Sequence, residues 1–363
     1  MVEGYVGKIL RVDLSSGKAS SEDLNEEWAR LFIGGKGLGA KYLYEEAKPG
    51  VDPLSPDNTL ILMTGPLAGT TAPCAPKYAI YTKSPLTNAF LDSYMGGYLG
   101  AELKFAGFDG VIVKGKAEKP VYLWITDGEA ELRDAKNLWG LDIHETEKRI
   151  REELEDKEVK VAAIGPAGEK FARIACITVD LYRHAGRGGT GAVMGSKNLK
   201  AIAVRGHQGV SVPNIEEFIE LSKEITKNDV LTEENIWAKT DGTPGFLQMV
   251  QEGGILPTRN FKMGTYEHAN EIDSDALKKK IFVRRRACYG CPLGCGNLTQ
   301  VKDGPFAGTV VEGPEYETLA MAGANCYIKD LEAIAHFNLL CDKLGLDTIS
   351  TGDAIAFAME CYE

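Results

Sequence analysis

The chain has 363 residues, a formal net charge of −11 and a hydrophobic content of 44%. This length allows two or three domains, each with its own core. The acidic balance excludes a general nucleic-acid binder, because such proteins need a basic excess to displace counterions from phosphates. No apolar run is long enough to span a membrane, and the first twenty residues contain no secretory signal. We therefore expect a cytoplasmic protein with no nucleic-acid or membrane partner.

The first 206 residues predict strands mixed with helices. Leu10, Val12 and Leu14 alternate as in a strand, and a turn follows at residues 15–18. Further β-type runs lie at residues 60–63, 79–82, 111–113, 121–125, 161–164, 174–178 and 201–204. Helical stretches are expected at residues 25–32, 38–46 and 144–155. Strands in groups, with few helices between them, predict an α+β fold with a mixed β-sheet rather than a doubly wound fold.

A domain boundary is expected near residues 206–214, where Gly206, Gly209 and Pro213 follow the last predicted strand. Residues 1–207 are predicted to form a β-rich base domain, and residues 208–363 an incomplete, mostly helical domain. Its helices are expected at 215–227, 245–252, 275–284, 330–344 and 352–362. Glu360 and Glu363 lie at the carboxyl end of the last helix, where the helix dipole disfavours negative charge. This ending indicates a truncated gene, an expression fragment or one half of a split protein.

Three of the eight cysteines are grouped as C-x-x-C-x-x-x-C, at Cys288, Cys291 and Cys295. Such close spacing, with glycine and proline between, predicts a shared metal centre. A [4Fe–4S] cluster takes four thiolates, and structural zinc also takes four ligands. The absence of a second zinc knuckle favours iron–sulfur, while zinc and a metal-free group remain alternatives. The motif itself supplies only three of the four ligands. Cys326, Cys341 and Cys361 could supply the fourth, although the first two are more typical of packed core cysteines.

Several glycine-rich segments point to a second kind of ligand. They lie at residues 34–39, 96–100, 165–168, 185–191 and 194–197. Consecutive backbone N–H groups beside cations bind anions, as around Arg187. Any one of these segments could be an ordinary tight turn. Together they favour a large ligand that carries phosphates.

Many specific strings resemble the tungsten aldehyde:ferredoxin oxidoreductase family, in order along nearly the whole chain. They lie at residues 65–67, 83–87, 100–107, 164–169, 185–199, 288–295, 313–317 and 342–350. The resemblance implies a β-sheet base domain that binds tungstopterin, in which two molybdopterins chelate one tungsten or molybdenum ion. It implies oxidation of a small aldehyde to a carboxylic acid. Electrons would pass through a [4Fe–4S] cluster to ferredoxin.

The resemblance also implies roles for particular residues. Those expected at the pterin phosphates are Gly96, Gly97, Arg183, Ala185, Gly186 and Arg187. The first of two D-x-x-G-L motifs that grip the pterin rings corresponds to Asp342, Leu346 and Asp347. Three of the four cluster ligands correspond to Cys288, Cys291 and Cys295. The fourth ligand and the second motif belong to the later half of the family chain, which is absent here.

Some positions depart from the family pattern. Lys77 stands where the family often has an arginine between cluster and pterin, so the charge remains but the forked donor is lost. Residues 94–97 read Tyr-Met-Gly-Gly, where the family often has Asn-Ser-Gly-Gly at a contact with magnesium and phosphate. This difference leaves open whether Mg²⁺ binds there. Glu317 aligns with a family glutamate near tungsten and could move protons, or could be a structural carboxylate at a helix start.

The partners are expected to be ferredoxin and a carboxyl-terminal half or partner chain. The family's dimer-bridging glutamate aligns with His336, so a homo-oligomer is left open. The alternative function is that of an incomplete or split-gene subunit. Such a subunit would bind pterin and cluster only together with a second chain and would have no activity alone.

Overall fold

The computed structural model describes residues 3–363 and divides the chain into two compact units. The first, here called the sheet unit, runs to Glu224 and includes residues 288–291 and 343–346. The second, here called the helical unit, contains residues 225–287, 292–342 and 347–363. The chain therefore passes between the two units several times, and the boundary expected at residue 207 remains a prediction.

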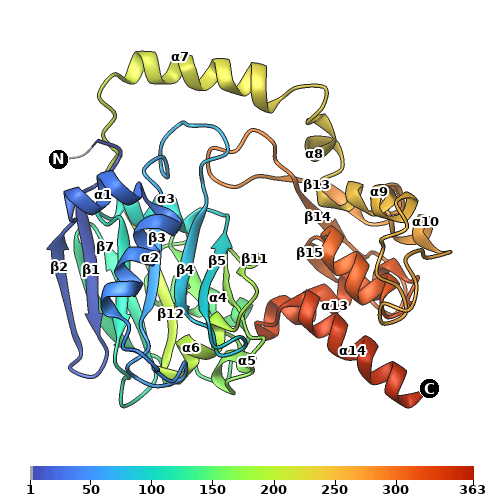
Figure 1. Cartoon of the computed structure of the whole chain (residues 1–363), viewed down its shortest axis with the longest axis horizontal. Coiled ribbons are helices and arrows are strands. Elements are labelled where there is room, and N and C mark those ends of the chain that lie inside the picture. Colours follow the sequence, from blue (N-terminus) through green and yellow to red (C-terminus); the bar gives the residue numbers. More distant parts are fainter. Residues whose placement is uncertain (1–2) are drawn as a thin grey trace. The chain divides into compact units, whose positions relative to one another are not determined.

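The sheet unit contains two six-stranded sheets (Figure 1). The first has the order β2-β1-β6-β3-β4-β5, with β1 Lys8–Asp13, β2 Lys18–Asp23, β3 Leu60–Thr64, β4 Tyr78–Lys83, β5 Phe90–Met95 and β6 Gly110–Lys114. The second has the order β11-β10-β9-β12-β7-β8, with β7 Val121–Thr126, β8 Glu129–Asp134, β9 Lys160–Ala163, β10 Ile177–Val179, β11 Arg183–Ala185 and β12 Leu199–Arg205. Parallel pairs, β1 with β6 and β7 with β12, occur beside antiparallel ones, so both sheets are mixed as predicted.

Alternation along the strands creates three buried layers of apolar side chains. In β3, Leu60 and Leu62 belong to a core that also contains Leu123 and Ile202 of the second sheet, so the two sheets pack face to face. Ile61 points the other way, into a core shared with helices α1 (Glu26–Phe32) and α2 (Gly35–Glu46). A third core lies between the second sheet and helix α4 (Ile143–Glu153). The order of layers is thus helix, sheet, sheet, helix, and burial of these faces drives folding.

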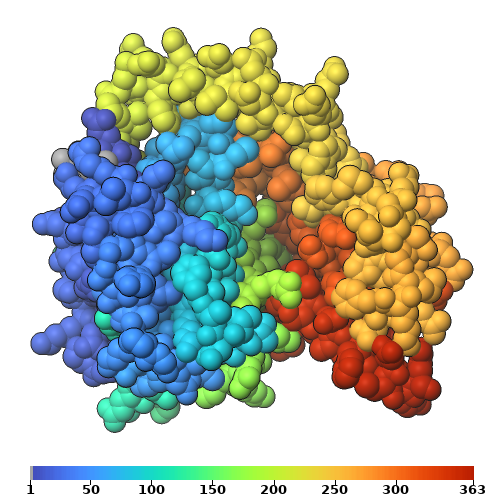
Figure 2. Space-filling model, in the orientation of Figure 1, coloured from blue at the N-terminus to red at the C-terminus, as the bar shows by residue number. Residues whose placement is uncertain are grey.

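Local signals fix where these helices begin. Asn25 caps α1 by accepting a hydrogen bond from the Trp28 amide at 3.0 Å, and Asp142 caps α4 through the Glu145 amide at 2.8 Å. The remaining helices of the unit are α3 (Leu99–Phe105), α5 (Pro166–Glu169), α6 (Thr190–Ser196) and α7 (Ile215–Ile225). In Figure 2 the amino-terminal residues, drawn in blue, form much of the visible surface of this unit.

The helical unit begins with a π-helical turn, η1 (Thr226–Val230), and carries one three-stranded antiparallel sheet, β13-β14-β15. Its other elements are α8 (Ile236–Thr240), η2 (Thr243–Gly245), α9 (Phe246–Glu252), α10 (Ala269–Ile272), α11 (Ser274–Lys280), β13 (Phe282–Arg286), β14 (Gly296–Gln300), β15 (Val310–Glu312), α12 (Tyr316–Thr318), η3 (Leu319–Ala324), α13 (Leu331–Leu344) and α14 (Thr348–Tyr362). The helix predicted at 275–284 is wrong beyond Lys280. Residues 282–286 form a strand instead, because pairing with β14 overrides their local preference.

The predicted α+β class is confirmed by this arrangement. Among residues 3–363, no helix has both the length and the apolar character needed to cross a membrane.

Candidate functional site

The turn between β5 and α3, formed by Gly96, Gly97 and Tyr98, is the centre of the candidate site. Gly97 has a φ of 87°, in the left-handed region that favours glycine. The Tyr98 amide donates a hydrogen bond to Asp180 Oδ2 at 2.7 Å. A Cβ atom at Gly97 would lie 2.3 Å from the same oxygen. Glycine is therefore required if Asp180 is to approach the turn and hold it.

Residues of the predicted cluster motif lie against this turn, although they are far away in the sequence. A Cβ atom at Gly96 would lie 2.7 Å from Cys288 Sγ, so the thiol occupies the space that a side chain would fill. The Tyr289 amide donates to Gly97 O at 3.2 Å. The Tyr289 ring packs edge-on against Tyr98, with a centroid separation of 6.4 Å. These contacts fix the first half of the cysteine motif within the sheet unit.

The β10–β11 hairpin brings the predicted phosphate-binding residues to the same place. Arg183 lies in β11, and its Cγ is 3.4 Å from the position of a Cβ at Gly97. Ala185 is buried, and its carbonyl accepts a hydrogen bond from Thr190 Oγ1 at 2.9 Å. A Cβ at Gly186 would meet only His184 Cβ, at 3.9 Å, so the backbone there is open. Arg187 is exposed. Open backbone beside two arginines is suited to binding an anion.

Tyr78 is a buried polar residue at this site. Its side chain is 1% exposed, and its hydroxyl has no hydrogen-bond partner among residues 3–363. Burial raises the pKa of Tyr78 well above its ordinary value, and the nearby charges of Asp180 and Cys288 raise it further. A buried hydroxyl without a partner is costly, so a ligand that accepted its hydrogen bond would stabilise the site.

The D-x-x-G-L segment, residues 342–346, contributes to both units. In the sheet unit, the Cys176 amide donates to Gly345 O at 2.9 Å, and Leu346 forms a bridge with Ala175 just before β10. In the helical unit, buried Asp342 accepts hydrogen bonds from Asn338 Nδ2 at 3.1 Å.

Asp347 has a structural role that the sequence analysis missed. It caps helix α14, accepting from the amides of Ile349 and Ser350 at 3.1 and 3.2 Å. The signal was present, because an aspartate directly before the first residues of a helix is a typical N-cap.

Three other predicted residues are placed without being joined to this turn by a described contact. Lys77 is exposed and directly precedes β4, and Glu317 is exposed in α12 of the helical unit. Cys295 also belongs to the helical unit and directly precedes β14. In the part of the chain that the structure describes, no three His, Cys, Asp or Glu side chains are grouped as a ready metal site. The predicted metal-binding role of the three cysteines therefore stays a prediction.

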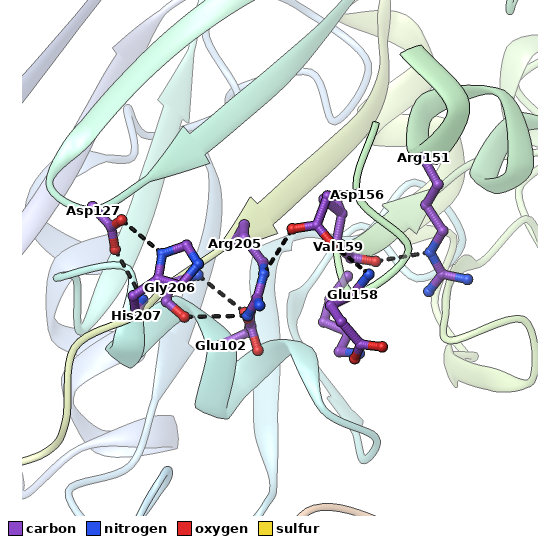
Figure 3. Close-up of polar contacts among 10 residues, drawn as sticks. Glu102, Asp127, Arg151, Asp156, Glu158, Val159, Arg205, Gly206 and His207 are labelled. Carbon is purple, nitrogen blue, oxygen red and sulfur yellow. Dashed lines mark hydrogen bonds and ion pairs between the residues drawn. The ribbon is translucent and has the colours of Figure 1, made fainter. Parts of the chain in front are cut away.

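A polar network joins helix α3 to the end of strand β12 (Figure 3). Helix α3 starts directly after the turn, and its Glu102 accepts hydrogen bonds from Arg205 Nη1 at 2.8 Å and the Gly206 amide at 3.0 Å. Arg205 Nε also donates to Asp156 Oδ2 at 2.9 Å. At the same end of β12, His207 Nδ1 lies 2.8 Å from Asp127 Oδ2. The end of β12 is thus fixed to α3, to the loop after α4 and to the β7–β8 turn.

Sequence reasoning missed three residues of this site: Cys74, Tyr78 and Asp180. Cys74 Sγ lies 3.9 Å from Cys291 Sγ. Asp180 stands three residues before Arg183, next to a segment already assigned to phosphate binding, which was a usable signal. The positions of Cys74 and Tyr78 depend on strand pairing and long-range packing, which no local sequence pattern reveals.

Comparisons with known proteins identify the family of the chain. Residues 9–206 match the model for the aldehyde ferredoxin oxidoreductase N-terminal domain, and residues 217–363 match the model for domains 2 and 3. The tungsten-containing aldehyde ferredoxin oxidoreductase of Pyrococcus abyssi is 47% identical over 99% of this chain and 59% of its own length. The aliphatic sulfonate oxidoreductase WOR-like subunit of Pyrococcus furiosus is 36% identical over 99% of this chain and 60% of its own length.

A solved structure resembles the chain as well. It is the active site complex BamBC of benzoyl coenzyme A reductase with 1,5-dienoyl-CoA, at a TM-score of 0.85 and 31% identity. The match covers 99% of this chain and 56% of that one. The chain thus spans less than two thirds of the length of these relatives. Within that span, both family models and the close relatives agree, and the chain belongs to the aldehyde ferredoxin oxidoreductase family.

Proposed function

We propose that this chain is the tungstopterin- and cluster-binding part of an enzyme that oxidises aldehydes to carboxylic acids and passes the electrons to ferredoxin. The observation that carries the proposal is the position of Cys288 against the Gly96–Gly97 turn, beside Arg183. Cys288 and Cys291, expected at a cluster, lie in the same compact unit as the residues expected at pterin phosphates. Such proximity is what electron transfer between two bound groups requires.

The residues of the sheet unit fit a phosphate-bearing cofactor. Gly186 offers open backbone, and Arg183 and Arg187 supply positive charge on either side of it. Gly97 lets Asp180 hold the turn, and the buried Tyr78 hydroxyl still needs an acceptor. When bound, the pterin-held tungsten or molybdenum would supply two-electron oxidation, and a [4Fe–4S] cluster would carry electrons singly to ferredoxin. The chain's own residues would orient these groups and neutralise their charge.

The thiols of Cys288 and Cys291 fit an iron–sulfur site by their chemistry. Both are half-buried and neither is in a disulfide, so both can serve as thiolate ligands. Cys295 is proposed as the third ligand. Lys77 would contribute a positive charge next to the cluster, and an exposed Glu317 could exchange protons with solvent. Asp342, Leu346 and Asp347 are proposed pterin contacts. We include in the proposal a Mg²⁺ ion bound at the pterin phosphates.

The test uses protein purified anaerobically from its native host, so that cofactors and any partner chain are retained. We expect tungsten or molybdenum, pterin, iron and acid-labile sulfide in fixed ratios to the chain, and aldehyde-dependent reduction of ferredoxin. Material with neither pterin nor sulfide would refute the proposal. Zinc as the sole metal would favour a structural site instead.

Cys291→Ala in the assembled protein is expected to abolish cluster absorbance and ferredoxin reduction. Cys361→Ala is a matched control, because Cys361 is an exposed thiol at the end of α14 in the helical unit. It should leave both properties unchanged. Undiminished electron transfer in the Cys291 variant would remove the cluster from the mechanism.

A further inference from the structure

A run of basic residues lies directly before the cysteine motif. Residues 278–286 read Lys-Lys-Lys-Ile-Phe-Val-Arg-Arg-Arg, so six of these nine residues are cations. No nine-residue stretch elsewhere in the chain has more than three lysines and arginines, and the chain as a whole has a net charge of −11. The densest positive charge of an acidic protein therefore lies next to the residues expected at a metal centre.

Three of these cations are exposed and form no ion pair among residues 3–363. Lys279 and Lys280 end helix α11, and Arg284 lies in strand β13, all in the helical unit. Buried Leu277 and Ile281 anchor the backbone on either side of the two lysines. Strand β13 is at the edge of its three-stranded sheet, so a partner can approach it from the open side. We call Lys279, Lys280 and Arg284 the basic patch.

The other three cations of the run have partners within the helical unit. Lys278 pairs with Asp241, and Arg286 Nε lies 3.4 Å from Glu312 Oε2. Arg285 donates to an asparagine side chain of β14. These contacts hold α11 and β13 in place, so the three residues serve folding and are left out of the test below.

The basic patch is close to proposed cluster ligands on the same stretch of chain. Arg286 pairs with Gly296 across β13 and β14, which places Cys295 beside the end of β13. Arg286 is also two residues before Cys288, so their Cα atoms are at most about 7.6 Å apart. A protein docked on β13 would lie near any group that these two cysteines hold. An electron acceptor needs such a position.

We propose that the basic patch is where ferredoxin docks, through an acidic face of its own. The proposal rests on the proposed function, which makes ferredoxin the electron acceptor. Opposite charges on the two surfaces would steer their encounter and fix their orientation.

Two structural roles compete with docking. Lysines in the last turn of a helix complement its dipole, and charged side chains on an edge strand prevent aggregation. Loss of these roles would change stability or solubility, but it would not change the affinity for ferredoxin. The test therefore measures the Michaelis constant for ferredoxin.

The experiment uses the assembled protein, expressed in its native host and purified anaerobically, with the ferredoxin of that host. The patch variant carries Lys279→Gln, Lys280→Gln and Arg284→Gln. The assay follows ferredoxin reduction at saturating acetaldehyde or benzaldehyde, whichever is oxidised faster. In parallel, methyl viologen serves as a small acceptor that needs no docking surface.

A matched control variant removes the same charge elsewhere. It carries Lys116→Gln, Lys119→Gln and Lys170→Gln, at three exposed lysines of the sheet unit that form no ion pair within the described residues. The two variants therefore have equal net charge. A difference between them reports where the charge lies, rather than how much of it there is.

At low ionic strength we expect the patch variant to raise the KM for ferredoxin about tenfold and to leave kcat unchanged. The KM for aldehyde and the rate with methyl viologen should match wild type. Added salt should raise the wild-type KM toward that of the patch variant, because it screens the attraction. The control variant should follow wild type throughout.

Two results would overturn the proposal. The patch variant might keep the wild-type KM for ferredoxin, with or without a loss of stability, or the control variant might show an equal rise. Either result would leave the basic patch with a structural role only.

Failure of the proposed function gives a different result. Wild type would then oxidise neither aldehyde with methyl viologen, and ferredoxin binding would be measured directly by calorimetry at low ionic strength. A Kd about tenfold higher in the patch variant than in the control variant would support docking at the patch. Equal Kd values, or no binding to wild type, would refute it.

Discussion

Gly96 leaves room for the Cys288 thiol, and a methyl group at that position would lie 2.7 Å from Sγ. Because Sγ is the end of a rotatable side chain, the thiol can swing away at a cost of about 1 kcal/mol or less. We therefore expect Gly96→Ala to leave the free energy of unfolding nearly unchanged. The same variant should retain iron about tenfold more weakly after anaerobic reconstitution with iron and sulfide, because the displaced thiol would no longer point to the metal that we propose it binds.

The control for that prediction is Gly209→Ala, at a glycine with no heavy atom within 4 Å of the added methyl group. It should match wild type in both stability and iron retention. If Gly96→Ala also retained iron like wild type, Cys288 would not be held as a ligand by this turn.

At the scale of single residues, the family resemblance grouped residues that the structure brings together. It implies one phosphate-bearing ligand for Gly97 and Arg183, and the structure places the two side by side. Their binding role stays a prediction. Cys74 was not predicted, because its proximity to Cys291 depends on where a loop after β3 folds back in space. Tyr78 lies just before the strand predicted at residues 79–82, and the sequence assigned it no role. A strand residue that will be buried without a hydrogen-bond partner looks like any other tyrosine in the sequence.

At the scale of elements, Arg205 connects the end of β12 to α3 and to the loop after α4 (Figure 3). Glu102, its partner on α3, has a side chain that is only 9% exposed. Arg205→Met would leave this buried carboxylate without its guanidinium, and we expect a loss of about 2–3 kcal/mol in the free energy of unfolding. Urea denaturation followed by circular dichroism measures it.

A matched control is Arg149→Met. Arg149 Nε pairs with Glu145 at 2.9 Å on the surface of α4, and its side chain is half exposed. An exposed pair of this kind contributes little, so we expect a change of under about 0.5 kcal/mol. Equal losses in the two variants would mean that Arg205 does not hold α3 in place.

Helix α4 carries a carboxyl group that makes stability depend on pH. Burial raises the pKa of Glu147 from its ordinary value of 4.5 to about 7. Arg151 lowers it and Asp180 raises it, but both effects are smaller than that of burial. Because the folded pKa lies above the unfolded one, the contribution of Glu147 is fully present below about pH 4.5. It is lost as the pH rises through about 7.

We therefore expect Glu147→Gln to be as stable as wild type near pH 4.5 and more stable by about 2–3 kcal/mol above pH 8. Denaturation curves over this pH range provide the measurement. Glu152→Gln, at a side chain that is 63% exposed, is the control and should show no such pH-dependent gain. If the free energies of unfolding of Glu147→Gln and wild type differed by the same amount at every pH, the raised pKa of Glu147 would be contradicted.

Elements were predictable where apolar residues run together or alternate with polar ones, or where helix caps occur. Strand β3, buried along its whole length, was found within one residue, whereas β2, β5, β8 and β11 of the sheet unit were not predicted. All four lie at sheet edges and none is buried along its length, so they lack the buried stripe from which a strand is recognised. Strand β13 was predicted as part of a helix because its partner β14 lies beyond the cysteine motif in the sequence.

At the scale of the whole molecule, Gly345 lies where the chain returns to the sheet unit. It has a φ of 74°, and a Cβ there would lie 3.0 Å from the Gly165 amide nitrogen. We expect Gly345→Ala to lower the free energy of unfolding by about 2–4 kcal/mol, through left-handed strain plus crowding against backbone. The motif glycine is then required by folding, independently of any bound pterin.

Gly128→Ala separates the effect of left-handed strain on the free energy of unfolding from the effect of crowding. Gly128 has a φ of 91° and no heavy atom near the added methyl group, so only the strain of about 1–2 kcal/mol should remain. Thermal or urea denaturation of both variants gives the comparison. If the two losses were equal, close packing of Gly345 on Gly165 would contribute nothing.

The single domain boundary expected at residue 207 stays a prediction. Gly206, Gly209 and Pro213 mark a change from strands to helices, and a single boundary is what such a change indicates. The return of residues 288–291 and 343–346 to the sheet unit has no marker of its own in the sequence. It depends on contacts such as that of the Cys176 amide with Gly345 O, between residues far apart along the chain.

That return has a consequence during synthesis. Strand β12 leaves the ribosome roughly 140 residues before Leu346, a delay of about 7–30 s at ordinary elongation rates. For that time the Cys176 amide awaits its acceptor, while the turn at Gly97 awaits Tyr289 for a shorter interval of roughly 85 residues. The nascent sandwich therefore lacks these contacts while the ribosome is still translating the helical unit.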